Sequence, residues 1–183
     1  GAGVSCEWLV PKALETLERP PAVFAAAKRF LEAADWVVWQ LTACEARNAC
    51  AAGYKGCWSS AAGYPSEAFL NALHPQLGAL RGKLTGVPVI AAGTRVGGLT
   101  AAWAKRLGLK EGTPVGAAII DAHAAVPACA LAEPGDLAII LGTSFCHILL
   151  GAAGAPDDAA GVAGSVQDGI LPGLLGYEAG QAG

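Results

Sequence analysis

Several residue types are missing from all or part of this sequence, and each gap narrows the choice of protein class. Methionine is absent from all 183 residues, so we expect an internal piece of a longer chain. Lysine and arginine are absent after Lys110: the first 111 residues carry 12 basic and 8 acidic side chains, whereas the last 72 carry seven acidic and no basic ones. Neither half has the extended basic run that binding to nucleic acid phosphates requires, which argues against a nucleic-acid-binding protein.

The six cysteines show no metal-binding or disulfide pattern. They stand at positions 6, 44, 50, 57, 129 and 146, with no C-x-x-C pair among them. Cys146 and His147 are neighbours, but on a strand adjacent side chains point to opposite faces, so they cannot bind one metal ion together. We therefore expect reduced, mostly buried thiols in a cytoplasmic protein.

The chain is apolar but does not contain a clear membrane span. Hydrophobic residues make up 54% of it and charged residues 15%, which is typical of a globular core. The stretch from Leu137 to Pro156 has 20 residues without a charge, which is the length of a membrane helix. Gly142-Thr143-Ser144 divides this stretch into two runs of strand length, so two buried strands joined by a turn are the better interpretation.

The first third of the sequence predicts helices. Pro11 can occupy the first position of a helix that runs to Glu18, and the following prolines end it and open a second helix. Asp35 can cap a third, very apolar segment. Trp36 and Trp39 in that segment are expected in the core.

The middle of the sequence is less regular. Cys44 to Tyr64 is rich in Gly, Ala and Ser and is predicted as loops and short turns, where function often lies. Ser66 can cap a short helix through Leu73, and Leu99 to Leu107 predicts another helix that Gly108 ends.

The pattern changes after residue 114. An apolar strand over 115–120 leads into Asp121, and a helical segment over 122–131 contains Pro127, which should interrupt or kink it. A turn at 133–136 precedes two strands over 137–141 and 145–150. Strand, helix, turn and hairpin in this order indicate an α/β architecture.

Asp121 is the first candidate for chemistry. At the end of a strand in an open α/β sheet a side chain faces the ligand crevice. A lone Asp at such a place serves equally often as a helix N-cap, so position alone leaves a catalytic base and a cap open.

Gly142, Thr143 and Ser144 form the second candidate. The glycine permits a sharp turn that exposes backbone N–H groups beside two hydroxyls, and such a turn can bind a phosphate. By itself it is typical of an ordinary hairpin. Together with a strand-terminal Asp it is compatible with phosphoryl transfer, in which one carboxylate accepts the proton of the substrate hydroxyl.

The sequence resembles the FGGY carbohydrate kinases, and within them the ribulokinase branch, over essentially its whole length. Each matching segment is weak alone, but together and in this order they are specific. The segments are 5–12, 34–42, Gly53-Tyr54-Lys55, Asp121-Ala122-His123, 142–144 with 146–150, and 176–181, whereas Phe145 departs from the family pattern.

This resemblance implies a partial actin-like, ribonuclease-H-like α/β fold. Residues 1–131 would be the C-terminal part of the first, sugar-binding FGGY domain, and residues 132–183 the start of the second, nucleotide-binding domain. The family's N-terminal phosphate loop and its adenosine-binding motif would lie outside the chain, so the chain alone should not turn over ATP.

The resemblance also implies roles for individual residues. Asp121 would be the catalytic base and would contact the sugar together with Lys55 and Glu178, while Gly142, Thr143 and Ser144 would bind phosphate. The implied activity is ATP-dependent phosphorylation of ribulose to ribulose 5-phosphate in cytoplasmic pentose (arabinose) catabolism. ATP and Mg²⁺ are the implied cofactors, a homo-oligomer is left open, and a membrane partner is not expected.

Alternatives remain at this point. Without the resemblance, Lys55 could be a solvated loop lysine and Glu178 an acid at a helix start. Another FGGY sugar or polyol kinase, such as a xylulokinase, is the second interpretation. A non-catalytic actin-like binding segment is the third, with Asp121 only a cap and the Gly142 turn only a hairpin.

Overall fold

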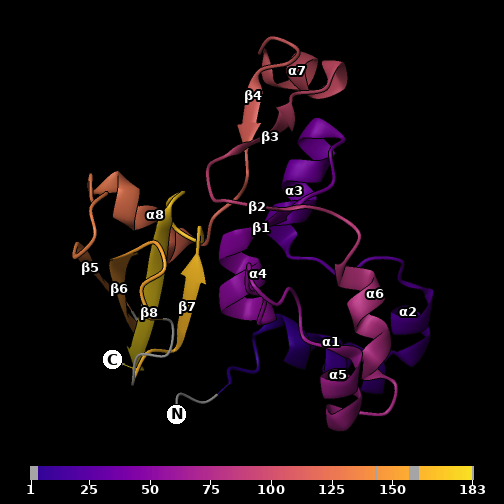
Figure 1. The fold of residues 1–183 in the computed structure, drawn as a ribbon. Helices are drawn as coiled ribbons and strands as arrows, with labels where there is room; N and C mark the ends of the chain where they lie inside the picture. The colour runs from indigo at the N-terminus through magenta and orange to yellow at the C-terminus, as the bar shows by residue number, and fades with distance from the viewer. Residues whose placement is uncertain (1–3, 143, 157–160, 183) are drawn as a thin grey trace.

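The computed structural model describes residues 4–142, 144–156 and 161–182, apart from the side chains of residues 144, 181 and 182. Figure 1 shows a helical body, a small projecting β-pair with its helix, and a four-stranded sheet. The elements of the first two parts are α1 (Leu9–Glu18), α2 (Pro21–Ala26), α3 (Ala33–Thr42), β1 (Arg47–Asn48), α4 (Ala49–Gly56), α5 (Glu67–Leu73), η1 (Leu77–Ala79), α6 (Leu80–Leu84), β2 (Val89–Ile90), β3 (Arg95–Gly98), α7 (Ala101–Leu107) and β4 (Pro114–Gly116). The sheet and its covering helix comprise α8 (Asp121–Ala128), β5 (Leu137–Leu141), β6 (Ser144–Ala152), β7 (Gly164–Gln167) and β8 (Leu174–Ala182).

The helical body is built around an apolar core. Helix α1 buries one stripe of side chains and lies against α2, α4 and η1. Helix α5 begins where Ser66 Oγ accepts a hydrogen bond from the N–H of Phe69, as the sequence predicts. The predicted end of one helix and start of the next at Pro20 and Pro21 is also confirmed, because α1 ends at Glu18 and α2 begins at Pro21. The buried members of this core are Leu9, Val10, Ala13, Leu17, Phe24, Ala52, Tyr64, Leu70, Leu77, Leu80 and Leu84.

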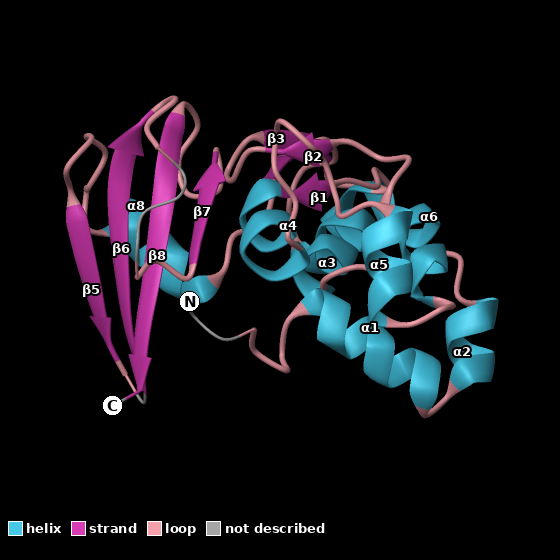
Figure 2. Cartoon of the chain, turned by 60° about the horizontal axis from the view of Figure 1, so that its bottom comes forward, coloured by secondary structure: helices cyan, strands magenta, loops and turns pink. Residues whose placement is uncertain are grey.

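The sheet is antiparallel with strand order β5-β6-β8-β7. The predicted hairpin is confirmed, since β5 pairs with β6 up to Leu141 opposite Phe145. One face carries Ile148 and Leu150, which are buried against α4 and α8 (Figure 2). The other face carries exposed apolar side chains such as Leu137 and Ile139. Within the described residues, no helix combines the length and apolar character that a membrane crossing requires.

Helix α4 contradicts the predicted loop between Cys44 and Tyr64. Asn48 caps this helix through a 2.7 Å hydrogen bond from the N–H of Ala51 to its Oδ1. The small residues that suggested a loop instead let the helix pack closely on the sheet, because a Cβ at Gly53 would clash with both methyl groups of Val166. Tertiary burial therefore decides the conformation of this segment.

The strand predicted to lead directly into Asp121 is also wrong. Strand β4 ends at Gly116 and pairs antiparallel with β3, and the residues between Gly116 and Asp121 are not in a strand. Pro127 lies inside α8, and the helix ends one residue later, at Ala128, as a proline effect predicts. Nearby, α7 confirms the predicted helix and its end at Gly108, where φ is +68°, although it begins at Ala101, after Thr100 as its cap, rather than at Leu99.

Three expectations about the first part of the chain are wrong. Asp35 does not cap α3, because that helix already begins at Ala33 and the Asp35 carboxylate binds Asn48 instead. Trp36 is 51% exposed and Trp39 is only half-buried, because α3 turns Val38 rather than the indoles to the protein. Pro11 is the third residue of α1, which begins at Leu9.

The cysteines are unpaired, as expected, but they are not mostly buried. Only Cys50 is buried and Cys146 is half-buried. The remaining four, Cys6, Cys44, Cys57 and Cys129, are exposed.

Candidate functional site

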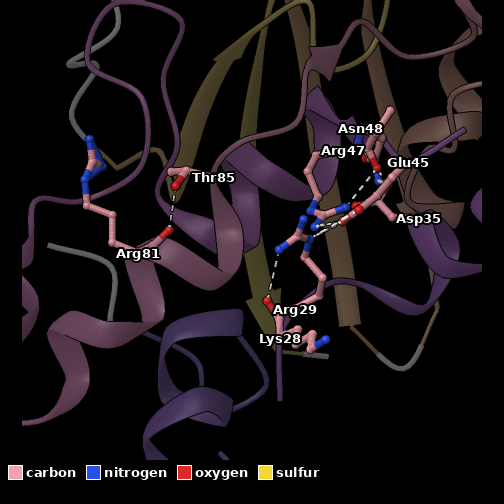
Figure 3. A network of polar contacts seen from close by, with 9 residues as sticks. Lys28, Arg29, Asp35, Glu45, Arg47, Asn48, Arg81 and Thr85 are labelled. Atoms are coloured by element: carbon pink, nitrogen blue, oxygen red, sulfur yellow. Dashed lines mark hydrogen bonds and ion pairs between the residues drawn. The ribbon is translucent and has the colours of Figure 1, made fainter. Parts of the chain in front are cut away.

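The start of α4 is fixed by a buried polar pair. Asp35 Oδ1 accepts hydrogen bonds from the backbone N–H of Asn48 at 2.9 Å and from its side-chain Nδ2 at 2.7 Å (Figure 3). Burial raises the pKa of Asp35, while both bonds from Asn48 lower it. Because Asn48 also caps α4, this pair ties α3 to the helix that carries Lys55.

Beside this pair, a cavity of about 250 Å³ brings together two of the residues predicted as site residues. Lys55 reaches it from α4, and Asp121 reaches it from the first turn of α8. Its lining is Glu32, Ala33, Ala34, Asn48, Ala51, Lys55, Ile119, Ile120 and Asp121. A cavity with one ammonium and two carboxylates in its wall can bind and orient a polyhydroxylated ligand.

Asp121 stands at the start of a helix rather than at the end of a strand. Its Oδ1 accepts a 2.9 Å hydrogen bond from the N–H of Ala122, and the N-cap position belongs to Ile120. The side chain is exposed, so its carboxylate is free to meet a ligand. Asp121 therefore adjoins a cavity, but not at the strand end that was predicted, and its catalytic role stays a prediction.

Lys55 and Glu178 occupy elements other than those considered for them. Lys55 is half-buried in the last turn of α4, and Glu178 lies on β8 opposite Ile148, so neither the loop lysine nor the helix-start acid is correct. Burial raises the pKa of Glu32, and the positive charge of Lys55 partly opposes this rise. The same charge also contributes to the lowered pKa of Glu178, so Lys55 acts electrostatically on both carboxylates.

Two side chains inside the protein contact the carboxylate of Glu178, His123 at ion-pair distance and Cys146 by a hydrogen bond. Its Oε2 lies 3.4 Å from Nε2 of His123, and its Oε1 accepts a 3.4 Å hydrogen bond from Sγ of Cys146. Burial raises the pKa of Glu178, but His123, Cys146 and Lys55 outweigh burial, and the net pKa is lowered. Glu178 is thus favoured as an ionised acceptor, with 27% of its side chain exposed.

Sequence reasoning gave no role to His123 or Tyr54. The ring of His123 is 1% exposed and lies 4.4 Å from the ring of Tyr54, centroid to centroid. Among the described residues, the Tyr54 hydroxyl and both ring nitrogens of His123 have no partner with hydrogen-bond geometry. The only available signal was the occurrence of both residues in matching segments, Gly53-Tyr54-Lys55 and Asp121-Ala122-His123.

The predicted phosphate turn is only partly described. Thr143 lies outside the described residues, as does the side chain of Ser144. Gly142 is exposed, directly after β5, and Ser144 opens β6 two residues before Cys146. Phosphate binding by this turn stays a prediction.

A larger cavity, about 720 Å³, lies elsewhere, between the helices of the helical body. Its lining includes Phe24, Asn71 and Lys83 but none of the residues predicted as site residues. The smaller cavity is the stronger candidate, because titratable groups from separate elements converge on it. In the described part of the chain, no group of three or more His, Cys, Asp or Glu side chains could bind a metal ion.

Comparisons with known proteins agree on one enzyme class, although no family model matches the chain. The chain is 46% identical over 186 residues to a ribulokinase of Bacillus licheniformis and 46% identical over 182 residues to a ribulokinase of Shouchella clausii. Both alignments cover 100% of this chain but only 33% and 32% of the relatives, so the chain spans about a third of their length.

Solved structures give the same picture for the fold. A xylulose kinase from Rhodospirillum rubrum matches with a TM-score of 0.79 and 22% identity, over 98% of this chain and 35% of the other. A xylulose kinase from Brucella ovis matches with a TM-score of 0.75 and 20% identity, over 94% and 34%. The predicted α/β sugar-kinase fold, in part, is confirmed.

Proposed function

Since the chain belongs to the ribulokinase branch of the FGGY carbohydrate kinases, we propose that it supplies about a third of an enzyme that phosphorylates ribulose with ATP. The product would be ribulose 5-phosphate. The observation that carries the proposal is the cavity that both Asp121 and Lys55 line, with Glu178 within electrostatic reach of Lys55.

The residues of this chain would act on the sugar as follows. Asp121 accepts the proton of the terminal hydroxyl as that oxygen attacks the γ-phosphorus, and the bond to the ADP oxygen breaks with its electron pair leaving on ADP. Lys55 donates hydrogen bonds to sugar hydroxyls, and the ionised Glu178 accepts from them. The exposed Asp121 carboxylate and the half-buried Lys55 suit these tasks.

We also propose the domain division at residue 131 and phosphate binding by residues 142–144. The sheet of residues 132–183 would begin the nucleotide-binding domain, and the helices before it would form the C-terminal part of the sugar-binding domain.

ATP would be the phosphoryl donor. Mg²⁺ is usually bound to the substrate phosphates with few protein ligands. Because the described residues offer no metal cluster of their own, we assign no Mg²⁺ ligand and no step through the ion.

A cytoplasmic location and a place in pentose breakdown follow from the same proposal.

Assays of the complete enzyme with several ketopentoses distinguish ribulose from related sugars as the substrate. Ribulose is expected to be the best substrate of the complete enzyme by kcat/KM. A higher kcat/KM for xylulose would favour the other sugar kinases, and no turnover of any ketopentose would favour a non-catalytic segment.

Asp121→Asn tests the base directly. In the complete enzyme, kcat is expected to fall about 100- to 10,000-fold, because the amide cannot accept the proton, while the Kd for ribulose changes little. Glu111→Gln, an exposed acid in the turn before β4, is the matched control and should retain wild-type turnover. Wild-type turnover in Asp121→Asn would remove Asp121 from the base role.

A further inference from the structure

One buried side chain connects the two carboxylates that the proposed function uses. Asp121 and His123 are two residues apart on α8, so they project from different sides of the helix. Asp121 points to the cavity, whereas His123 is buried beside Tyr54 and reaches Glu178 on β8. Contact between His123 and Glu178 therefore joins the helix of the base to the strand of the sugar acceptor.

We propose that His123 is a positioning residue, which holds the Glu178 carboxylate in a fixed orientation relative to Asp121 for binding of the sugar. The inference rests on the proposed function, because it assigns His123 a task only if Glu178 binds substrate.

Burial of His123 supports this role over simple packing. With 1% of its surface exposed, both of its ring nitrogens are shut off from solvent, and a buried polar group without a full partner lowers stability. An apolar side chain would fill the same space at lower cost. The Nε2 atom nevertheless lies 3.4 Å from Oε2 of Glu178. The imidazole ring packs against the Tyr54 ring, with an angle of 38° between the two ring planes.

Cys146 completes the support of Glu178 from the other side. Burial, followed by the charge of Glu178, raises the pKa of Cys146 to about 12, so its sulfur carries a proton to donate. The two Glu178 oxygens are thus held separately, one by His123 and one by Cys146. The titratable groups that surround Glu178 are Cys50, Tyr54 and Lys55 on α4, His123 on α8 and Cys146 on β6.

Two substitutions in the complete enzyme test the proposal. His123→Phe keeps an aromatic ring beside Tyr54 and removes both nitrogens, and the KM for ribulose is expected to rise about 10- to 100-fold, with kcat within about threefold of wild type. His123→Gln retains an N–H that can reach Glu178 and should recover most of this loss. His147→Gln, on the opposite face of β6, should leave both constants unchanged.

The pH profile supplies a readout that packing alone would not move. Without His123 the pKa of Glu178 should rise, so Glu178 is protonated at higher pH and the acid limb of kcat/KM moves upward in His123→Phe. An unchanged KM and acid limb would overturn the proposal, as would a KM in His123→Gln as high as in His123→Phe. If His123→Phe does not fold, the acid limb of His123→Gln decides: it must lie above that of wild type, because any loss of support for the ionised Glu178 carboxylate raises its pKa.

Failure of the proposed function would look different. In that case the wild-type enzyme would not phosphorylate ribulose at all. If it used another ketopentose, the same variants would be compared with that sugar.

Discussion

The two hydrophobic cores of this chain differ in what they bury. The core of the helical body contains aliphatic and aromatic side chains only, with Leu70 and Leu77 completely enclosed. The core between α4, α8 and the sheet has similar apolar members, such as Val126 and Ile148, but His123 and the Tyr54 hydroxyl are buried within it. A buried polar group without a hydrogen-bond partner lowers the free energy of unfolding. From this difference we expect that the first core serves stability alone and that the second also supports the proposed site.

Substitution of Leu70 should separate the cores most clearly. Leu70→Ala removes a fully enclosed side chain of α5 and should lower the free energy of unfolding by about 2–5 kcal/mol. Urea denaturation of the complete enzyme measures the loss, and the KM for ribulose should stay near wild type while the protein is folded. Leu73→Ala, on the same helix but 52% exposed, is the control and should cost less than about 0.5 kcal/mol. A rise in the KM for ribulose in folded Leu70→Ala would contradict the expectation that this core affects stability but not the site.

Helical glycines give a second contrast, with effects of opposite sign. Gly53→Ala would drive a methyl group into Val166 where α4 meets β7, and should cost about 1–3 kcal/mol. It should also raise the KM for ribulose, because α4 carries Lys55. Gly82→Ala, on α6, has open space around the new methyl group and should stabilise by about 0.5–1 kcal/mol. Thermal unfolding of both variants tests this, and equal effects would show that α4 can move away from the sheet without cost.

Local sequence signals predicted much of the helical body and the hairpin. Ser66, Thr100 and Gly108 act at helix ends through their own side chains or backbone, so their effects can be inferred without knowledge of the fold. The β5–β6 hairpin follows equally from two apolar runs around Gly142.

The same reasoning failed where packing decides the structure. Helix α4 is stabilised by contacts with β7 and by the Asp35–Asn48 pair, thirteen residues apart, which no window along the chain reveals. The exposure of Trp36 likewise depends on which side of α3 faces the body.

The site was predicted residue by residue but not as a network. Lys55, Asp121 and Glu178 came from segments matched to a family, and the structure puts two of them in one cavity with the third within electrostatic reach. His123 and Tyr54 lie in the same matched segments, but the segments gave them no role, because their contacts join side chains of α4, α8 and β8.

Removal of the Tyr54 hydroxyl should have the smallest effect and sharpens the comparison of the cores. Tyr54 is 4% exposed, and its hydroxyl has no hydrogen-bond partner among the described residues. Tyr54→Phe keeps the ring against His123 and deletes an uncompensated polar group, so the free energy of unfolding should stay equal or rise by up to about 1 kcal/mol.

Tyr54→Leu is the matched control for this substitution. It removes the ring contact as well and should destabilise by about 0.5–1.5 kcal/mol beyond any loss of buried area, with a rise in KM as His123 loses its support. Urea titrations of the two variants side by side give the comparison. If Tyr54→Phe were instead destabilised by more than about 1 kcal/mol, the hydroxyl would have a hydrogen-bond partner in solution, and the polar character of this core would then reflect stability rather than the needs of the site.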